Sequence, residues 1–344
     1  MNNKYSLTSC YMFFMGIAVL LTVSCKKDLP DDRLALGADA IFTSTIYSPT
    51  LGRNTLFTEN FNSGTGSGLP LDFKIINLRR RDGSAAPELT ENFPVKVWTK
   101  AYTGTEKSLA EIEEKRKIEN HPLFEIRKHS GQFLMWANSS ASFIRARPDS
   151  GYVFDVEVSN SGGRRYFKDF KLIPYRERAF EPSNQDPITG QAQSVGVGMS
   201  EIRNMEGEKR GNFISPYDIE AVFNKVNDTG NSLTFKFKDS LNNTMDPALF
   251  STTKWTELVH GFNMKMTPEY VKYDVSYPIP SVEFPTIYTN SSGSRSRAVF
   301  RYERVGRGNS LIKAYMALDF SIYERGDWEI IFKFKGERPK FTND

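Results

Sequence analysis

Short runs in which apolar and polar residues alternate recur along the chain, and they constrain its fold more than any other feature. In residues 151–159 the apolar side chains stand at every second position, at Tyr152, Phe154, Val156 and Val158. The same spacing recurs in the second half, first at Leu233, Phe235 and Phe237 and later at Trp328, Ile330, Phe332 and Phe334. A period of two is typical of β-strands with one buried and one solvent-facing side. The pattern predicts a mainly β chain built from antiparallel sheets.

Turn-forming residues separate these runs at short intervals, with few helical segments between them. Asn160–Gly163 and Asn227–Gly230 are examples of such turns. Many short strands without alternating helices favour antiparallel β-sandwiches of the jelly-roll or immunoglobulin-like type. Residues 174–190 are rich in charge and proline, so we place a domain boundary there. The sequence thus predicts two sandwich domains, over residues 47–178 and 190–344.

One helix is predicted, near residues 108–120. Ser108 and Glu111 have the spacing of a capping box. Glu113 and Lys117 are spaced as an i,i+4 ion pair, and Pro122 would end the helix after His121. Because isolated helices of this length are marginally stable, we expect this one to pack on a sheet.

The N-terminus has the pattern of an export signal. A run of about 13 apolar residues follows Lys4, too short for a bilayer, which needs about 20 helical residues. Leu21–Cys25 resembles the lipobox of bacterial lipoproteins, although Thr22 stands where a leucine is usual. The resemblance implies a signal peptide of residues 1–24, lipid attachment at Cys25 and a lipid-anchored tether over residues 25–46. The alternatives are an ordinary signal peptide and an uncleaved membrane anchor.

The cysteines agree with lipidation. The chain has two, Cys10 beside the apolar run and Cys25, so cleavage before Cys25 leaves one. A free thiol would be reactive in an exported protein, whereas acyl chains on it would anchor the protein to membrane lipid. Lys26 follows the cysteine, and by resemblance to lipoprotein sorting this implies the outer membrane. The Lys and Asp residues after it resemble tags that direct such proteins to the cell exterior.

Composition narrows the choice of partner. A formal net charge of +4 over 344 residues is close to balanced and argues against binding to nucleic acid. Aromatic residues make up 13% of the chain, enough to build a substantial core rather than a disordered chain.

Several stretches resemble an uncharacterised family of Bacteroidetes lipoproteins that carries a domain of unknown function. The resemblance covers nearly the whole exported chain and is carried by Tyr47–Arg53, Phe93–Trp98, Leu123–Arg127, His129–Gly131, Arg147–Tyr152 and Leu258–Phe262. It implies an accessory role in polysaccharide uptake, beside outer-membrane uptake components. It transfers no catalytic residues.

Motifs for catalysis and for cofactors are weak, so we predict neither an enzyme nor a cofactor. None of the histidines, His121, His129 and His260, has a metal-like spacing to another histidine or to a cysteine. Asp239, Asn242 and Asp246 place oxygen ligands in one loop and form a weak candidate for calcium, with an Asx-rich turn as the alternative.

Two tryptophans are candidate ligand-binding residues. Trp136 lies beside Asn138–Ser140, and Trp255 lies in the polar segment 251–257. They are better candidates for exposed platforms that bind sugar rings than Trp98 and Trp328, which lie in alternating runs and are expected in cores.

The function predicted from these features is non-catalytic carbohydrate binding by a lipid-anchored surface protein, for glycan capture or uptake. One alternative is a structural or adhesive protein related to fimbriae. The other is a glycan hydrolase, which needs two carboxylates at a set separation across a cleft. Exposure of Trp136 and Trp255 on one concave face would favour carbohydrate binding.

Overall fold

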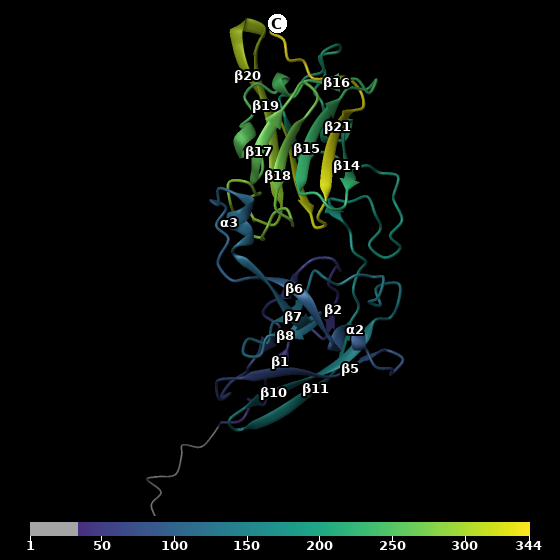
Figure 1. Cartoon of the computed structure of the whole chain (residues 1–344), viewed down its shortest axis with the longest axis vertical. Coiled ribbons are helices and arrows are strands. Elements are labelled where there is room, and N and C mark those ends of the chain that lie inside the picture. Colours follow the sequence, from purple (N-terminus) through teal and green to yellow (C-terminus); the bar gives the residue numbers. More distant parts are fainter. Residues whose placement is uncertain (1–33) are drawn as a thin grey trace, which may run out of the picture.

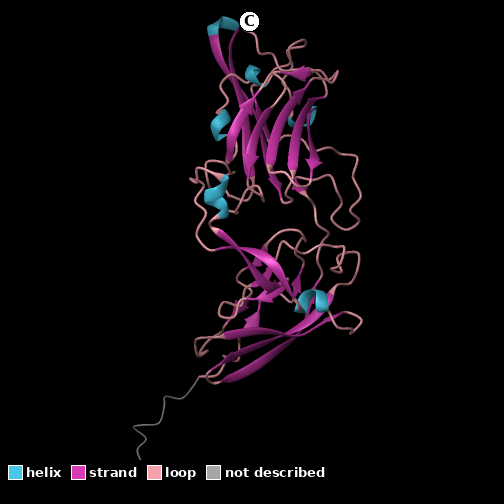
Figure 2. Ribbon diagram, in the orientation of Figure 1, coloured by secondary structure: helices cyan, strands magenta, loops and turns pink. Residues whose placement is uncertain are grey.

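The computed structural model describes residues 34–344, and within them the chain is mainly β, as predicted. Strands hold 43% of the residues and helices 7%, and Figure 2 shows how few and how short the helices are. The predicted signal peptide and Cys25 lie outside the described residues. Among residues 34–344, no helix has the length and apolarity needed to cross a bilayer.

The chain first builds an N-terminal part, residues 34–175, shown at the bottom of Figure 1. A four-stranded sheet in the order β2-β11-β10-β5 is joined there by a three-stranded sheet β3-β9-β8 and by the two-stranded pairs β1-β4 and β6-β7. The elements are β1 (Ile41–Phe42), β2 (Ile46–Tyr47), β3 (Thr55–Phe57), β4 (Phe61–Asn62), β5 (Asp72–Arg80), α2 (Pro87–Thr90), β6 (Asn92–Trp98), α3 (Leu109–Glu113), β7 (Arg116–Pro122), β8 (Phe124–Ile126), β9 (Phe133–Met135), β10 (Tyr152–Asn160) and β11 (Gly163–Leu172).

The C-terminal part, residues 180–344, lies at the top of Figure 1. Its larger sheet has the order β14-β21-β15-β18-β17, with β16 beside β15, and in its smaller sheet β20 pairs with β12, β13 and β19. The elements are β12 (Phe180–Glu181), β13 (Glu201–Arg203), η2 (Pro216–Asp218), β14 (Ile219–Asn227), β15 (Ser232–Lys238), β16 (Thr244–Met245), η3 (Pro247–Leu249), η4 (Trp255–Glu257), β17 (Gly261–Met266), β18 (Val271–Val275), β19 (Ser296–Gly306), η5 (Arg307–Asn309), β20 (Ser310–Ile322) and β21 (Asp327–Phe334).

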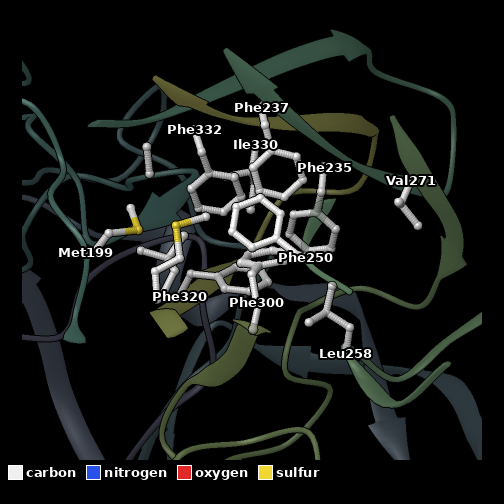
Figure 3. Close-up of a cluster of buried hydrophobic side chains, with 14 of the residues drawn as sticks. Met199, Phe235, Phe237, Phe250, Leu258, Val271, Phe300, Phe320, Ile330 and Phe332 are labelled. Carbon is white, nitrogen blue, oxygen red and sulfur yellow. The ribbon is translucent and has the colours of Figure 1, made fainter. Parts of the chain in front are cut away.

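Each part has its own cluster of buried side chains. In the C-terminal part both sheets contribute, so that Phe235 and Phe332 of the larger sheet meet Phe300 of the smaller one (Figure 3). In the N-terminal part, Phe133 lies against Phe154 and Tyr47. These aromatic contacts have the tilted and edge-to-face geometries that ring quadrupoles favour.

Most strand pairs are antiparallel, as the short turns predicted. The alternating run at residues 151–159 lies in β10, which pairs with β11 across the predicted turn Asn160–Gly163, and β8 pairs with β9 in the same way. Two pairs are parallel, β15 with β21 and β11 with β2. Because β15 and β21 are far apart in sequence, their side-by-side placement could not be read from turn positions.

The helix predicted near 108–120 is wrong in length. Ser108 does cap it, since its side chain accepts a hydrogen bond from the Glu111 amide, but α3 ends at Glu113. The following residues form the strand β7, which pairs with β6 along its whole length. Backbone pairing with a neighbouring strand therefore overrides the helical spacing. A second short helix, α2, was not predicted.

The described part of the predicted tether also differs from expectation. Ile46 and Tyr47 pair with β11, and the buried ring of Phe42 lies among Phe61, Phe73 and Phe170 in the N-terminal core. Apolar burial thus ties this segment into the fold from about residue 40 onward.

Candidate ligand-binding cleft between the two parts

The two parts of the chain meet through polar contacts that we call the seam. On the N-terminal side it consists of the β6–α3–β7 segment, with Tyr102, Glu106, Glu113 and Arg116, and on the C-terminal side of His260, Ser276 and Tyr277. Figure 1 shows α3 at the level where the parts meet. The His260 Nε2 lies 2.8 Å from the Glu106 carbonyl oxygen, and the Ser276 hydroxyl donates to Glu113 at 3.1 Å. The Tyr102 hydroxyl bonds to His260 Nδ1.

Beside the seam lies a cleft of about 530 Å³ whose walls come from both parts. It is lined by Gly52, Arg53, Asn54, Leu56, Lys96, Trp98, Arg116, Ala137 and Asn138 from the N-terminal part and by Tyr277, Pro278, Pro280, Ser281, Val282, Glu283, Ser294, Ser321 and Tyr323 from the C-terminal part. An adjoining recess of about 580 Å³ shares six of these residues and extends to Asn231 and Arg325. Aromatic rings beside a few polar groups are typical of small-molecule binding sites.

Arg116 enters the cleft from β7, opposite Trp98 in the strand register. Its guanidinium lies 4.1 Å from the centre of the Trp98 ring, and its side chain is 3% exposed. Nη1 donates to the Tyr277 carbonyl at 2.9 Å and to Glu113 at 3.2 Å. Nε and Nη2 are buried and have no hydrogen-bond partner among the described residues.

Arg53 repeats this arrangement on the other side of the cleft. Its guanidinium lies 3.8 Å from the centre of the Tyr323 ring, and Nη1 donates to the Tyr323 hydroxyl at 3.0 Å. Its Nε and Nη2 are likewise buried without a partner in residues 34–344. Leaving a buried donor unsatisfied costs about 1–3 kcal/mol. Two arginines in one cleft, each with an unpartnered Nε and Nη2, therefore need an explanation.

Glu181 ties the two parts together through three arginines. Its carboxylate accepts from Arg53 at 2.9 Å, from Arg178 at 2.6 Å and from Arg295 at 3.2 Å. These residues come from the N-terminal part, the junction and the C-terminal part, respectively. Three guanidinium groups thus surround one carboxylate, and Arg53 is the member of this cluster that lines the cleft.

The structure does not give Trp136 the exposure that the sequence predicted. Its side chain is 9% exposed and belongs to the N-terminal core, and its indole N–H donates to Glu125 at 3.2 Å. Trp255 lies in η4 of the C-terminal part, half-buried, with its ring centre 5.8 Å from that of Phe300. The two tryptophans therefore form no common platform, because each packs on the core of a different part.

The loop with Asp239, Asn242 and Asp246 is an Asx-rich turn, and the calcium prediction is not supported. Asp239 accepts from the amides of Leu241 and Asn243, and Asp246 accepts from the Ala248 amide as a helix cap. Their oxygens are thus directed at the backbone. No cluster of three or more potential metal ligands occurs among residues 34–344.

The histidines have structural partners. His121 bridges the carboxylates of Glu119 and Glu125, and hydrogen bonding to Glu119, strengthened by Glu125, raises its pKa. His260 stacks on Tyr288, with ring centres 4.7 Å apart, and belongs to the seam.

Sequence reasoning missed the residues that build the cleft, namely Arg53, Lys96, Trp98, Arg116 and Tyr323. Trp98 was assigned to a core, yet it is half-buried and lines the cleft. One signal was available: the family-like stretches Tyr47–Arg53 and Phe93–Trp98 contain three of these five residues. Nothing in the sequence indicated that those stretches would face each other.

Comparison with known proteins gives one match. A family model described as a domain of unknown function, DUF5007, matches residues 61–343. No curated protein and no solved structure matches the chain.

Proposed function

The chain belongs to the DUF5007 family, and with the function of that domain unknown we propose from the geometry of the cleft that the protein is a non-catalytic glycan-binding lipoprotein. In this proposal Cys25 carries lipid and holds the protein on the outer membrane, facing the exterior. The cleft captures a polysaccharide chain for outer-membrane uptake components. The lipid anchor and the uptake context rest on sequence resemblance, and the ligand site rests on the cleft.

The observation that carries the proposal is the composition of the cleft. The rings of Trp98 and Tyr323 line it together with the amide of Asn138 and the hydroxyl groups of serines. Sugar rings present apolar faces to aromatic side chains and hydroxyl groups to polar ones, and the lining contains residue types suited to both kinds of contact. The cleft and its adjoining recess share a wall, which gives room for more than one sugar unit.

The architecture proposed with this function is a pair of β-sandwich domains. In the C-terminal part, two sheets contribute side chains to one core, which is what a sandwich requires. Leu34, where the described chain begins, lies beside the turn between β10 and β11, since its carbonyl accepts from Asn160 at 3.1 Å. Figure 1 shows β10 and β11 at the end of the N-terminal part that is farther from the C-terminal part. An anchor attached there would leave the cleft directed away from the membrane.

A glycan array probed with the full chain in nonionic detergent tests glycan binding. Asn138 is exposed and lines both the cleft and the recess, so Asn138→Trp should fill the site without disturbing a core. We expect binding to at least one polysaccharide and its loss in Asn138→Trp. Asn224→Trp, at an exposed position on β14, is the matched control and should bind normally. Absence of binding to every glycan, or equal binding by both variants, would refute the proposal.

Metabolic labelling with an acyl-chain probe tests the anchor. Cys25→Ser should abolish labelling, because it removes the thiol to which the lipid is proposed to attach. Cys10→Ser is the matched control, and we expect it to leave labelling intact. Labelling that persists in Cys25→Ser would contradict the proposed attachment site.

A further inference from the structure

The paired arginines of the cleft specify the charge of its ligand. We propose that the glycan bound there is acidic, and that an anionic group on a sugar, a carboxylate or a sulfate ester, is held by Arg116, Arg53 and Lys96. This inference rests on the proposed function and assigns the class of glycan to the same site.

The first argument is the balance of charge around the cleft. Four cationic side chains line the cleft and its recess, namely Arg53, Lys96, Arg116 and Arg325. Two carboxylates line the same space, those of Glu113 and Glu283. The excess of positive charge is concentrated between low-dielectric walls, where it attracts anions more strongly than an exposed patch would.

The second argument is which donors are left without a partner. In both Arg116 and Arg53 the bonded nitrogen is Nη1, whereas Nε and Nη2 are unpartnered within the described chain. The Nε–Nη2 edge of a guanidinium presents two parallel N–H groups that match the two oxygens of a carboxylate or sulfate. Two arginines therefore keep the same anion-binding edge free in one cleft.

The third argument is preorganisation. Each guanidinium is held flat against an aromatic ring, Arg116 on Trp98 and Arg53 on Tyr323, at 4.1 Å and 3.8 Å from the ring centre. Stacking fixes the plane of each guanidinium group, so the side chain loses less rotational freedom when an anion binds. Lys96, on the same strand as Trp98, also lines the cleft, and its half-exposed ammonium group pairs with Glu113 at 2.9 Å.

Access to these edges requires the walls of the cleft to separate slightly, because the free nitrogens are buried. The walls belong to different parts of the chain: Arg116 comes from β7, and the Tyr277 carbonyl beside it comes from the segment after β18. Opening would exchange hydrogen bonds such as that from Arg116 to the Tyr277 carbonyl for bonds to water, at a small net cost for each bond. An anion entering the opened cleft would then satisfy the exposed edges.

The test measures binding of three soluble polymers to the full chain in nonionic detergent by isothermal titration calorimetry. The probes are polygalacturonate, dextran sulfate and neutral dextran. We expect at least one acidic polymer to bind more tightly than dextran, and the choice between them identifies carboxylate or sulfate as the anion. Binding should weaken as salt rises, because the exposed Lys96 contact is screened.

Variants separate a specific site from general attraction to a basic protein. Arg116→Lys keeps the charge but loses the two-pronged edge, and we expect about a tenfold loss of affinity for the acidic polymer. The control Arg307→Lys makes the same change at an exposed position in η5 and should have no effect. If Arg116→Lys does not fold, Lys96→Gln tests the same loss of affinity at a half-exposed side chain. Its control is Lys100→Gln, at an exposed position.

The outcomes distinguish this inference from the proposed function. If dextran binds as tightly as both acidic polymers, or if Arg116→Lys and Lys96→Gln both behave like their controls, the cleft has no anion specificity and the inference is overturned. In that case neutral glycans that lose binding in Asn138→Trp would still support the proposed function. Absence of binding to any glycan would overturn both.

Discussion

At the scale of single residues, Glu106 connects the stability of the seam to pH. Its side chain is 2% exposed, and it bonds to the Lys115 ammonium and to the Thr103 amide at 2.9 Å. Burial opposes ionisation of this carboxyl, but the bonds to Lys115 and Thr103 outweigh it and lower its pKa to about 2. The Glu106 backbone also accepts the His260 contact, so the ionised side chain helps to hold the loop that crosses the seam.

We predict that the stabilisation by ionised Glu106 is lost over a defined range of acidic pH. A carboxyl whose pKa is lowered on folding stabilises the fold above its unfolded value, near 4.5, and loses that effect as the pH falls toward about 2. The difference in unfolding free energy between the native chain and Glu106→Gln should be constant above pH 5.5 and shrink by at most about 3 kcal/mol below it. Urea unfolding between pH 2 and pH 7 measures this difference.

Lys115→Gln is the control, because it removes the main group that favours the ionised form. In its background, the loss of the Glu106 contribution should move upward, toward pH 4.5. A Glu106→Gln difference that stays unchanged down to pH 2 in the native background would contradict the assigned cause.

At the scale of elements, the sequence pattern correctly predicted strands that have one buried face. It gave a wrong prediction for β7, a strand without a clearly buried face. The alternating run at residues 328–334 became β21, whose Trp328, Ile330, Phe332 and Phe334 are all buried. In β7, by contrast, Ile118 is 62% exposed and charged residues surround it. A strand without a buried face does not show apolar residues at every second position of its sequence. The sequence of β7 was therefore assigned to the predicted helix on the basis of its i,i+4 charge spacing.

The candidate site was beyond prediction for a related reason. Arg53 donates to Tyr323 across 270 positions of sequence, and such a contact exists only after both parts have folded and met. Residue type alone pointed to tryptophans, yet Trp136 serves the core while Trp98 lines the cleft. Local patterns predict which side of a strand is buried, whereas the cleft depends on how separate sheets are placed.

At the scale of the whole molecule, two cores are joined by a short junction and a polar seam. Tyr175 still bridges to Thr50 of the N-terminal part, whereas Phe180 already pairs with Ile322 of the C-terminal part. Because each core packs separately and hydrogen bonds join the parts at the seam, we expect their stabilities to be weakly coupled. This arrangement allows the opening of the cleft that anion binding requires.

Separate cores predict separate unfolding transitions, which the tryptophans can report. Trp98 and Trp136 lie in the N-terminal part, and Trp255 and Trp328 lie in the C-terminal part. Phe133→Ala removes a fully buried ring from the N-terminal core and should cost about 3–5 kcal/mol there. In urea titrations followed by fluorescence, the signal of Trp98 and Trp136 should shift to lower urea while that of Trp255 and Trp328 stays in place.

The mirror variant, Phe300→Ala, removes a fully buried ring from the C-terminal core and should reverse the pattern. Each signal is isolated by replacing the two tryptophans of the other part with phenylalanine in the full chain. If either substitution moves both signals equally, the parts unfold as one cooperative unit. Separating the two parts at the seam would then cost too much free energy to open the cleft. A ligand would need another route to the Nε and Nη2 groups of Arg53 and Arg116.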